Sequence, residues 1–220
     1  MSSTTVHSAK KRKRHRIHGN PFSVPQPEDM LPLEALFRRP APLAIDIGFG
    51  AGQFLLELAH QKSEMNVLGI EIRPHFVEKI LDVAKDEGRT NLSAVLANVN
   101  RDIETLIPDD SVAFMSVNFP DPWFKKRHQK RRVINQGFLD IMLRKFRMDG
   151  QLHLMTDFEP IGLEARELLS GHPGYHSPHK GEFLEHSSTG IRSERESTHT
   201  GRGDPIYRLF YQKVREVPKD

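Results

Sequence analysis

The stretch LAIDIGFGAGQFLLELAHQ, residues 43–61, places a short apolar run, a loop with three glycines and an amphipathic segment in direct succession. Its first five residues have the length and composition of a buried β-strand. Phe54, Leu55 and Leu58 recur at helical spacing, which predicts a helix over residues 52–61. A strand, a glycine loop and a helix in this order form the first unit of an α/β fold.

The same alternation continues along the chain and predicts a mostly parallel sheet with helices on both of its faces. Residues 171–204 interrupt it, because they are rich in Gly, Pro, His and Ser; we expect a loop there with one strand near residues 182–186. The other predicted strands are 66–72, 92–97, 111–119, 151–157 and 205–214. A short helix is predicted at 33–37, a second begins at residue 74, a third passes through 138–146 and ends near 150, and a fourth follows residue 160.

Composition divides the chain into three parts. Residues 1–20 contain six Lys/Arg and no acid, and we expect a flexible basic arm. Residues 21–42 contain six prolines and predict an irregular lead-in, and residues 43–216 are predicted to form a single domain. The net charge is only +3, whereas the arm alone carries six positive charges. Such concentrated positive charge suits a polyanionic partner better than it suits general solubility.

Several classes of protein are excluded or disfavoured by composition. The chain has no cysteine, which excludes disulfides, thiol catalysis and cysteine-bound metals and fits a reducing cytoplasm. No apolar run approaches the ~20 residues that span a bilayer, and the N-terminus lacks the apolar core of a signal peptide. For the same reason we expect no membrane partner. The histidines at 172, 176, 179 and 186 match no zinc motif, so we expect no metal.

Polar residues stand where the predicted strands end. In a parallel sheet these ends share one edge, and ligands bind there. The residues are Asp46, Glu71, Asn98, Asp121 and Asp157.

The glycine loop and the polar residues near it indicate a nucleoside ligand. The spacing of Gly48, Gly50 and Gly52 is G-x-G-x-G, which disfavours the dinucleotide motif G-x-G-x-x-G, although NAD-dependent hydride transfer stays the main alternative. Asp46 before the loop favours a ligand with a cationic amino group. Glu71 can accept both hydroxyls of a ribose, and Asn98 can bond an adenine edge. Together these groups describe S-adenosylmethionine.

A second stretch, NFPDPWFKKRHQKRR at residues 118–132, pins an aspartate between two prolines and follows it with six Lys/Arg in eight positions. It resembles the signature of the bacterial tRNA (guanine-N7)-methyltransferase family, and the combination of matching motifs is highly specific. The resemblance covers roughly residues 14–215, through RHRIHGNPFS (14–23), DIGFGAG (46–52), GIEIR (69–73), TDFEP (156–160) and PIYRL (205–209).

This resemblance implies a Rossmann-like class I methyltransferase fold with an antiparallel C-terminal strand. It also implies a cytoplasmic enzyme, monomeric or homodimeric, that methylates N7 of a guanosine in the tRNA variable loop with S-adenosylmethionine as cofactor. The cofactor contacts carried over by motif are Asp46, Gly48, Gly50, Glu71, Asn98 and Asp121.

The resemblance also implies a set of residues for the RNA substrate. Lys125 and Asp157 match substrate positions, and Arg127 is expected to bind a nearby phosphate. The family's T-x-aromatic-E segment falls on residues 193–196, where Ser193 keeps the hydroxyl and Glu196 the carboxylate, but Arg195 replaces the aromatic residue. A gap of two would instead place this segment on residues 191–194.

Guanine N7 carries a free lone pair, so its methylation needs no general base; an enzyme has to position the purine and stabilise the positive charge that develops on it. Asp121 is the expected catalytic residue, because Pro122 narrows its backbone range and its carboxylate can contact the guanine or orient the cofactor. We expect Trp123 to pack under the same turn.

The alternatives to this function are a non-catalytic RNA-binding module and a methyltransferase that acts on another RNA or on a small molecule.

Overall fold

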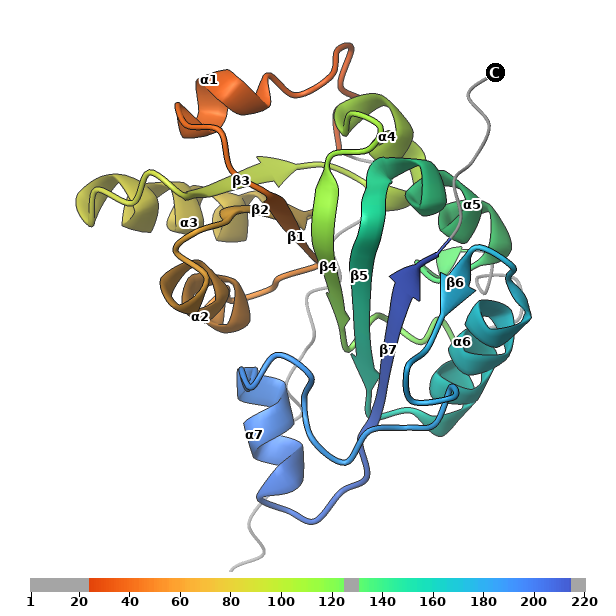
Figure 1. Cartoon of the computed structure of the whole chain (residues 1–220). Coiled ribbons are helices and arrows are strands. Elements are labelled where there is room, and N and C mark those ends of the chain that lie inside the picture. The colour runs from red at the N-terminus through yellow and green to blue at the C-terminus, as the bar shows by residue number, and fades with distance from the viewer. Residues whose placement is uncertain (1–23, 125–130, 215–220) are drawn as a thin grey trace, which may run out of the picture.

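The computed structural model describes residues 24–124 and 131–214. Within them, one sheet has the strand order β3-β2-β1-β4-β5-β7-β6 (Figure 1). The pairs among β1 to β5 are parallel, whereas β7 is antiparallel to both β5 and β6, so the predicted fold class is confirmed. The strands are β1 (Leu43–Ile47), β2 (Asn66–Glu71), β3 (Leu92–Leu96), β4 (Val112–Asn118), β5 (Phe146–Thr156), β6 (Tyr175–His176) and β7 (Tyr207–Lys213).

Helices cover both faces of the sheet, and each face has its own apolar core. On one face, α2 and α3 bury residues such as Leu55 and Ile80. On the other, α4, α5 and α6 bury residues such as Ile103, Phe138 and Leu169. The helices are α1 (Leu33–Phe37), α2 (Gln53–Gln61), α3 (Pro74–Asp86), α4 (Val99–Leu106), α5 (Gln136–Lys145), α6 (Glu159–Gly171) and α7 (Glu194–Thr200).

The strand order reverses between β1 and β4, because the chain builds β2 and β3 on one side of β1 and the remaining strands on the other. Such a switch point leaves a crevice at the carboxyl ends of the two central strands. The register places Asp46 of β1 directly beside Ser116 of β4. Figure 1 shows α7 beyond the carboxyl ends of β4 and β5, so that it closes the same edge of the sheet.

The helix predicted through residue 146 ends earlier than expected. It stops at Lys145, and Phe146 already pairs with Val112 in the sheet, so its predicted end near residue 150 was wrong. The amides of Asp110 and Ser111 donate to the last helix carbonyls at 3.0 Å, which favours termination there. Phe146 is fully buried and satisfies a helical or a strand pattern equally, which explains the error.

The segment from 171 to 204 also differs from its prediction. Among the described residues, no strand covers 182–186; this stretch lies beside β7 through one backbone bond, from the Leu184 amide to the Arg208 carbonyl. The segment instead contains β6 and the helix α7. The helix α4, which had not been predicted, begins at Val99; its N-cap residue is Asn98, whose amide donates to the Asp102 carboxylate at 2.9 Å.

The proline-rich lead-in is described from residue 24 and packs on the body of the molecule. Phe37 is buried in the core, and the Leu31 amide donates to the carbonyl of Leu106. The predicted basic arm, residues 1–20, lies outside the described residues, and the three-part division of the chain stays a prediction. No helix in the described part of the chain has the length and apolar character needed to cross a membrane.

Candidate functional site

A cavity of about 660 Å³ opens at the switch point between β1 and β4. Its size lies within the range of small-molecule sites. Lys125 and Arg127 lie outside the described residues, and Asp157 and Glu196 are not among the residues that line the cavity. The residues predicted from sequence that do line it are Asp46, Gly48, Gly50, Glu71, Asn98, Asp121 and Ser193.

The glycine loop forms one wall of the cavity, and its backbone requires glycine. Gly48, Gly50 and Gly52 have φ angles of 67°, 59° and 87°, in the left-handed region that side chains disfavour. A Cβ on Gly52 would lie 2.4 Å from Cδ1 of Ile80, so packing on α3 excludes one as well. A Cβ on Gly48 would meet no described atom within 4 Å, which leaves room for a ligand above the loop.

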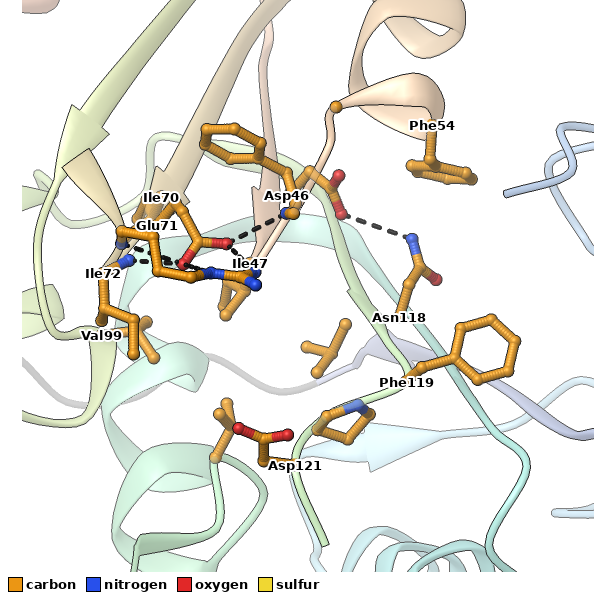
Figure 2. A pocket seen from close by; sticks show the side chains of 18 of the residues that line it. Asp46, Ile47, Phe54, Ile70, Glu71, Ile72, Val99, Asn118, Phe119 and Asp121 are labelled. Atoms are coloured by element: carbon orange, nitrogen blue, oxygen red, sulfur yellow. Dashed lines mark hydrogen bonds and ion pairs between the residues drawn. The ribbon is translucent and has the colours of Figure 1, made fainter. Parts of the chain in front are cut away.

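Asp46 is buried at the end of β1. One carboxylate oxygen accepts a hydrogen bond from Ser116 Oγ at 2.7 Å. The same oxygen accepts one from Asn118 Nδ2 at 3.4 Å (Figure 2). The other oxygen, Oδ2, has no hydrogen-bond partner among the described residues. Burial raises the pKa of Asp46 to about 7; the bond from Ser116 opposes this rise, and the nearby Glu71 carboxylate adds to it. A cation beside Oδ2 would favour the ionised form.

Glu71 ends β2, and its side chain is almost fully buried. Oε2 accepts from the Gly50 amide at 3.0 Å, and Oε1 accepts from the Ile72 and Arg73 amides at 2.8 and 3.1 Å. Arg73 also donates from its guanidinium, with Nε to Oε1 and Nη2 to Oε2, while its guanidinium lies 4.4 Å from the centre of the Phe76 ring. The predicted ribose acceptor is therefore held in place by backbone amides and covered by Arg73.

The turn 118–123 forms the opposite wall, and Figure 2 shows Asp121 and Glu71 on different sides of the cavity. Phe119 and Trp123 have φ angles of 52° and 44°, so two bulky residues adopt left-handed backbone on either side of Pro120-Asp121-Pro122. The Phe119 amide donates to the Met155 carbonyl at 2.7 Å, which fixes the start of the turn on β5. Strained backbone that neighbours hold in place is typical of functional sites.

Two arginines of the basic run lie inside the described residues and contact this turn. Arg132 Nε donates to the Pro122 carbonyl at 3.1 Å, and its guanidinium pairs with Glu164 of α6. Arg131 lies 5.3 Å from the centre of the Trp123 ring. Trp123, which we expected under the turn, is only partly buried and lines the cavity with Arg131. Arg132 thus supports the turn from within the protein.

Asp157, at the end of β5, contacts two residues from α7. Its two oxygens accept hydrogen bonds from Arg195 Nη2 at 2.9 and 2.7 Å, and Oδ2 lies 3.0 Å from His199 Nε2. Both Arg195 and His199 lie against Phe119, the guanidinium 5.1 Å from the ring centre and the imidazole stacked at 6.0 Å. The predicted substrate residue therefore holds α7 against the turn that carries Asp121.

Ser193 and Glu196 occupy the start of α7. Ser193 Oγ accepts from the Glu196 amide at 3.1 Å, which is the N-cap half of a capping box. Glu196 is buried, and Oε1 accepts from Arg208 Nε and Nη2 at 2.9 and 2.8 Å. Glu196 lines a second cavity, together with Arg208. Only Ser193 of this pair reaches the main cavity, and their substrate roles stay predictions.

Several residues of the site were not predicted from the sequence. Ser116 and Asn118 hold Asp46, and their alternation on the otherwise apolar strand 112–118 is a signal that could have identified them. Arg73 was not predicted, and Arg195 stood out only as a departure from a motif. No local pattern identifies Arg195, because its contacts to Phe119 and Asp157 depend on the tertiary fold.

The chain is similar in sequence to known methyltransferases. A family model described as "Putative methyltransferase" matches residues 40–209. A tRNA (guanine-N(7)-)-methyltransferase from Microcystis aeruginosa is 39% identical over 175 residues, which cover 78% of this chain and 82% of the relative. Proteins of the same name from Cronobacter sakazakii and Escherichia coli K12 are 40% and 38% identical, over 66% and 67% of this chain. These two matches span 61% and 62% of the relatives' own length.

Solved structures with the same fold include other methyltransferases. The aminoglycoside resistance methyltransferase NpmB1 has a TM-score of 0.55 at 20% identity, over 83% of this chain and 92% of its own. A 30S ribosomal A1408 methyltransferase from an uncultured bacterium has a TM-score of 0.56 at 14% identity, with the same coverage. At such low identity these likenesses establish the fold alone.

Proposed function

The chain belongs to the tRNA (guanine-N7)-methyltransferase family, and from this premise we propose that it transfers a methyl group from S-adenosylmethionine to N7 of a guanosine in the tRNA variable loop. One observation carries the proposal beyond family membership. A single cavity is lined both by the glycine loop with Asp46 and Glu71 and by the turn with Asp121. A nucleoside cofactor on the first wall would therefore lie within the same enclosure as a purine on the second.

The residues on the first wall fit S-adenosylmethionine. The buried Asp46 Oδ2, which lacks a partner in the described part of the chain, suits the ammonium of the methionine part. Glu71 would accept the ribose hydroxyls, and Asn98 lines the cavity where it can bond an adenine edge. The open space above Gly48 admits a ligand close to the backbone. When bound, the cofactor supplies an electrophilic methyl group on a sulfonium.

The residues on the second wall would act on the purine. Guanine N7 offers a free lone pair, so no side chain has to remove a proton before transfer. The base becomes cationic as the new bond forms, and the carboxylate of Asp121 would stabilise this charge. The turn holds Asp121 through Phe119 and Arg132, so that little reorganisation is needed at the moment of reaction.

Positive charge would bind the RNA backbone. Lys125 and Arg127 stay the predicted phosphate contacts, with the basic arm at residues 1–20 as a further one. Because such contacts release counterions, binding of tRNA should weaken steeply with salt. A small-molecule enzyme would show little salt dependence.

The test uses the full-length protein, unmodified tRNA transcripts and S-adenosylmethionine with a labelled methyl group. We expect 7-methylguanosine at one position of the variable loop after digestion to nucleosides. Label in a different nucleoside would contradict the proposed N7 chemistry. RNA binding without label transfer, together with no calorimetric binding of S-adenosylhomocysteine, would instead identify a non-catalytic RNA-binding module.

A further inference from the structure

Arg195 lies in the wall of the main cavity, together with Phe119 and Asp121. Its side chain is about one-third exposed, and Nη2 donates to both oxygens of Asp157. Neither Nε nor Nη1 donates a hydrogen bond to any described residue, so several guanidinium hydrogens remain for a ligand. The side chain is therefore anchored at one nitrogen and available at the others.

The surroundings of Arg195 restrict its movement. The guanidinium lies 5.1 Å from the centre of the Phe119 ring, and the same ring stacks on His199, whose Nε2 also contacts Asp157. Contacts with Asp157 and Phe119 thus restrain the guanidinium. Because Phe119 also begins the turn that carries Asp121, Arg195 has a fixed relation to the proposed reaction centre.

We propose that Arg195 reads the target base by donating a hydrogen bond from its guanidinium to O6 of the guanine, an inference that rests on the proposed function. Arginine commonly recognises guanine through O6 and N7, the two acceptors on one edge of the base. Here N7 must stay free to accept the methyl group, which leaves O6 for the protein. Adenine carries an amino group at this position and would set donor against donor, so Arg195 discriminates guanine from adenine.

The ion pair with Asp157 makes this recognition compatible with the chemistry. An isolated guanidinium beside the base would repel the positive charge that develops on methylation. Asp157 neutralises Arg195, so the pair offers hydrogen-bond donors without net charge. Asp157 is thereby a positioning residue for Arg195.

The experiment combines protein variants with a base analogue in the substrate. Ligated tRNA carries either guanosine or 2-aminopurine riboside at the methylated position; the analogue keeps N7 but lacks O6 and the N1 hydrogen. The ratio of kcat/KM for the two substrates is measured for the wild type, Arg195→Ala and Arg195→Gln. We expect the wild-type ratio to exceed that of Arg195→Ala by about 10- to 100-fold, the contribution of one charge-assisted hydrogen bond. Arg195→Gln, which keeps an amide donor, should be intermediate.

Arg166 supplies the matched control, because its guanidinium lies 4.9 Å from the centre of the Phe183 ring but it is not among the residues that line the cavity. Arg166→Ala should keep the wild-type ratio. Equal ratios in the wild type and Arg195→Ala would overturn the inference. So would loss of all activity in both Arg195 variants with S-adenosylhomocysteine binding intact, because one hydrogen bond cannot account for it. Failure of the proposed function appears separately, as a wild type that does not methylate guanosine.

Discussion

The two walls of the cavity require the same unusual backbone and obtain it from different residues. In the proposed cofactor half, defined by residues 46–52 and 71–73 with Asn98, the left-handed positions are Gly48, Gly50 and Gly52. In the proposed substrate half, defined by residues 118–123 and 193–195, they are Phe119 and Trp123. Glycine adopts this conformation without steric cost, whereas a bulky residue does so only when its surroundings impose it.

The supports of the two halves differ in the same way. Glu71 is held by backbone amides of Gly50, Ile72 and Arg73, which lie on two adjacent strand–loop units. The substrate half depends on contacts between distant segments, such as Phe119 with Met155 and Asp157 with Arg195. We infer that the backbone of the proposed cofactor half is set by its own glycines and by two adjacent strand–loop units, although Asp46 also needs Ser116 and Asn118 of β4. The proposed substrate half forms only when β4, β5 and α7 have come together.

The largest expected effect separates the halves by function. Asp121→Asn removes one charge from the substrate half and should lower the rate of methyl transfer at least ~100-fold, because charge stabilisation at the purine is lost. Affinity for S-adenosylhomocysteine should stay nearly unchanged. Single-turnover transfer and calorimetry measure the two quantities. Asp109→Asn, on the segment before β4 at the other end of the strand, is the control and should keep the wild-type rate.

An active Asp121→Asn enzyme would remove this carboxylate from the mechanism. Loss of cofactor affinity in the same variant would show that Asp121 belongs to the cofactor half.

The next effect tests the buried carboxylate of the cofactor half through pH. The pKa of Asp46 is raised to about 7, and a cationic ligand favours the ionised carboxylate. As the pH increases toward 7, affinity for S-adenosylhomocysteine should therefore rise by up to ~10-fold per pH unit and level off above 7. Asp46→Asn should bind more weakly and with a flatter pH profile. Calorimetry between pH 6 and 8 measures both, and an identical profile in the two proteins would contradict the role of Asp46.

The same residue predicts a stability effect of known sign. The pKa of Asp46 is raised from 3.8 in the unfolded chain to about 7, so its ionisation destabilises the free protein as pH rises between these values. At pH 8, Asp46→Asn should relieve a cost of roughly 4 kcal/mol in the free energy of unfolding that is absent near pH 4. Denaturant titrations at both pH values measure the difference.

Backbone strain in the substrate half gives a smaller effect. At Trp123, a Gly variant should be more stable than an Ala variant by about 1 kcal/mol, because both lose the ring but only alanine keeps the cost of the left-handed backbone. At the neighbouring Phe124, where φ is not positive, the order should reverse. Chemical denaturation compares the four variants. The same order at both positions would mean that the turn is not strained.

The smallest effect concerns Arg73, which covers the Glu71 carboxylate. Ribose hydroxyls would compete with its partly exposed guanidinium, so Arg73→Ala should bind S-adenosylhomocysteine about threefold more tightly, as expected for the loss of a weak ion pair. Arg89→Ala, which removes a surface pair with Glu87, is the control. Weaker binding by Arg73→Ala would mean that Arg73 contacts the cofactor itself.

The contrast between the halves also explains what could be predicted from the sequence. The glycine loop, Asp46 and Glu71 follow from strand ends and spacing, so their common location could be predicted from residue patterns alone. Asp121 was found through its prolines, but the left-handed backbone at Phe119 and Trp123 has no signature in residue type. The S-x-x-E pattern at Ser193 predicts a helix start, yet residues 171–204 were assigned to a loop because their composition favours one. Arg195 depends on β5 and β4 and could not be placed from local patterns.

A crystal structure of this chain with S-adenosylhomocysteine tests the central claim most directly. The account predicts the ligand's ammonium within hydrogen-bond distance of Asp46 Oδ2, its ribose hydroxyls on Glu71, and its sulfur facing the wall that carries Asp121. A ligand bound outside this cavity, or one whose sulfur faces away from Asp121, would contradict it.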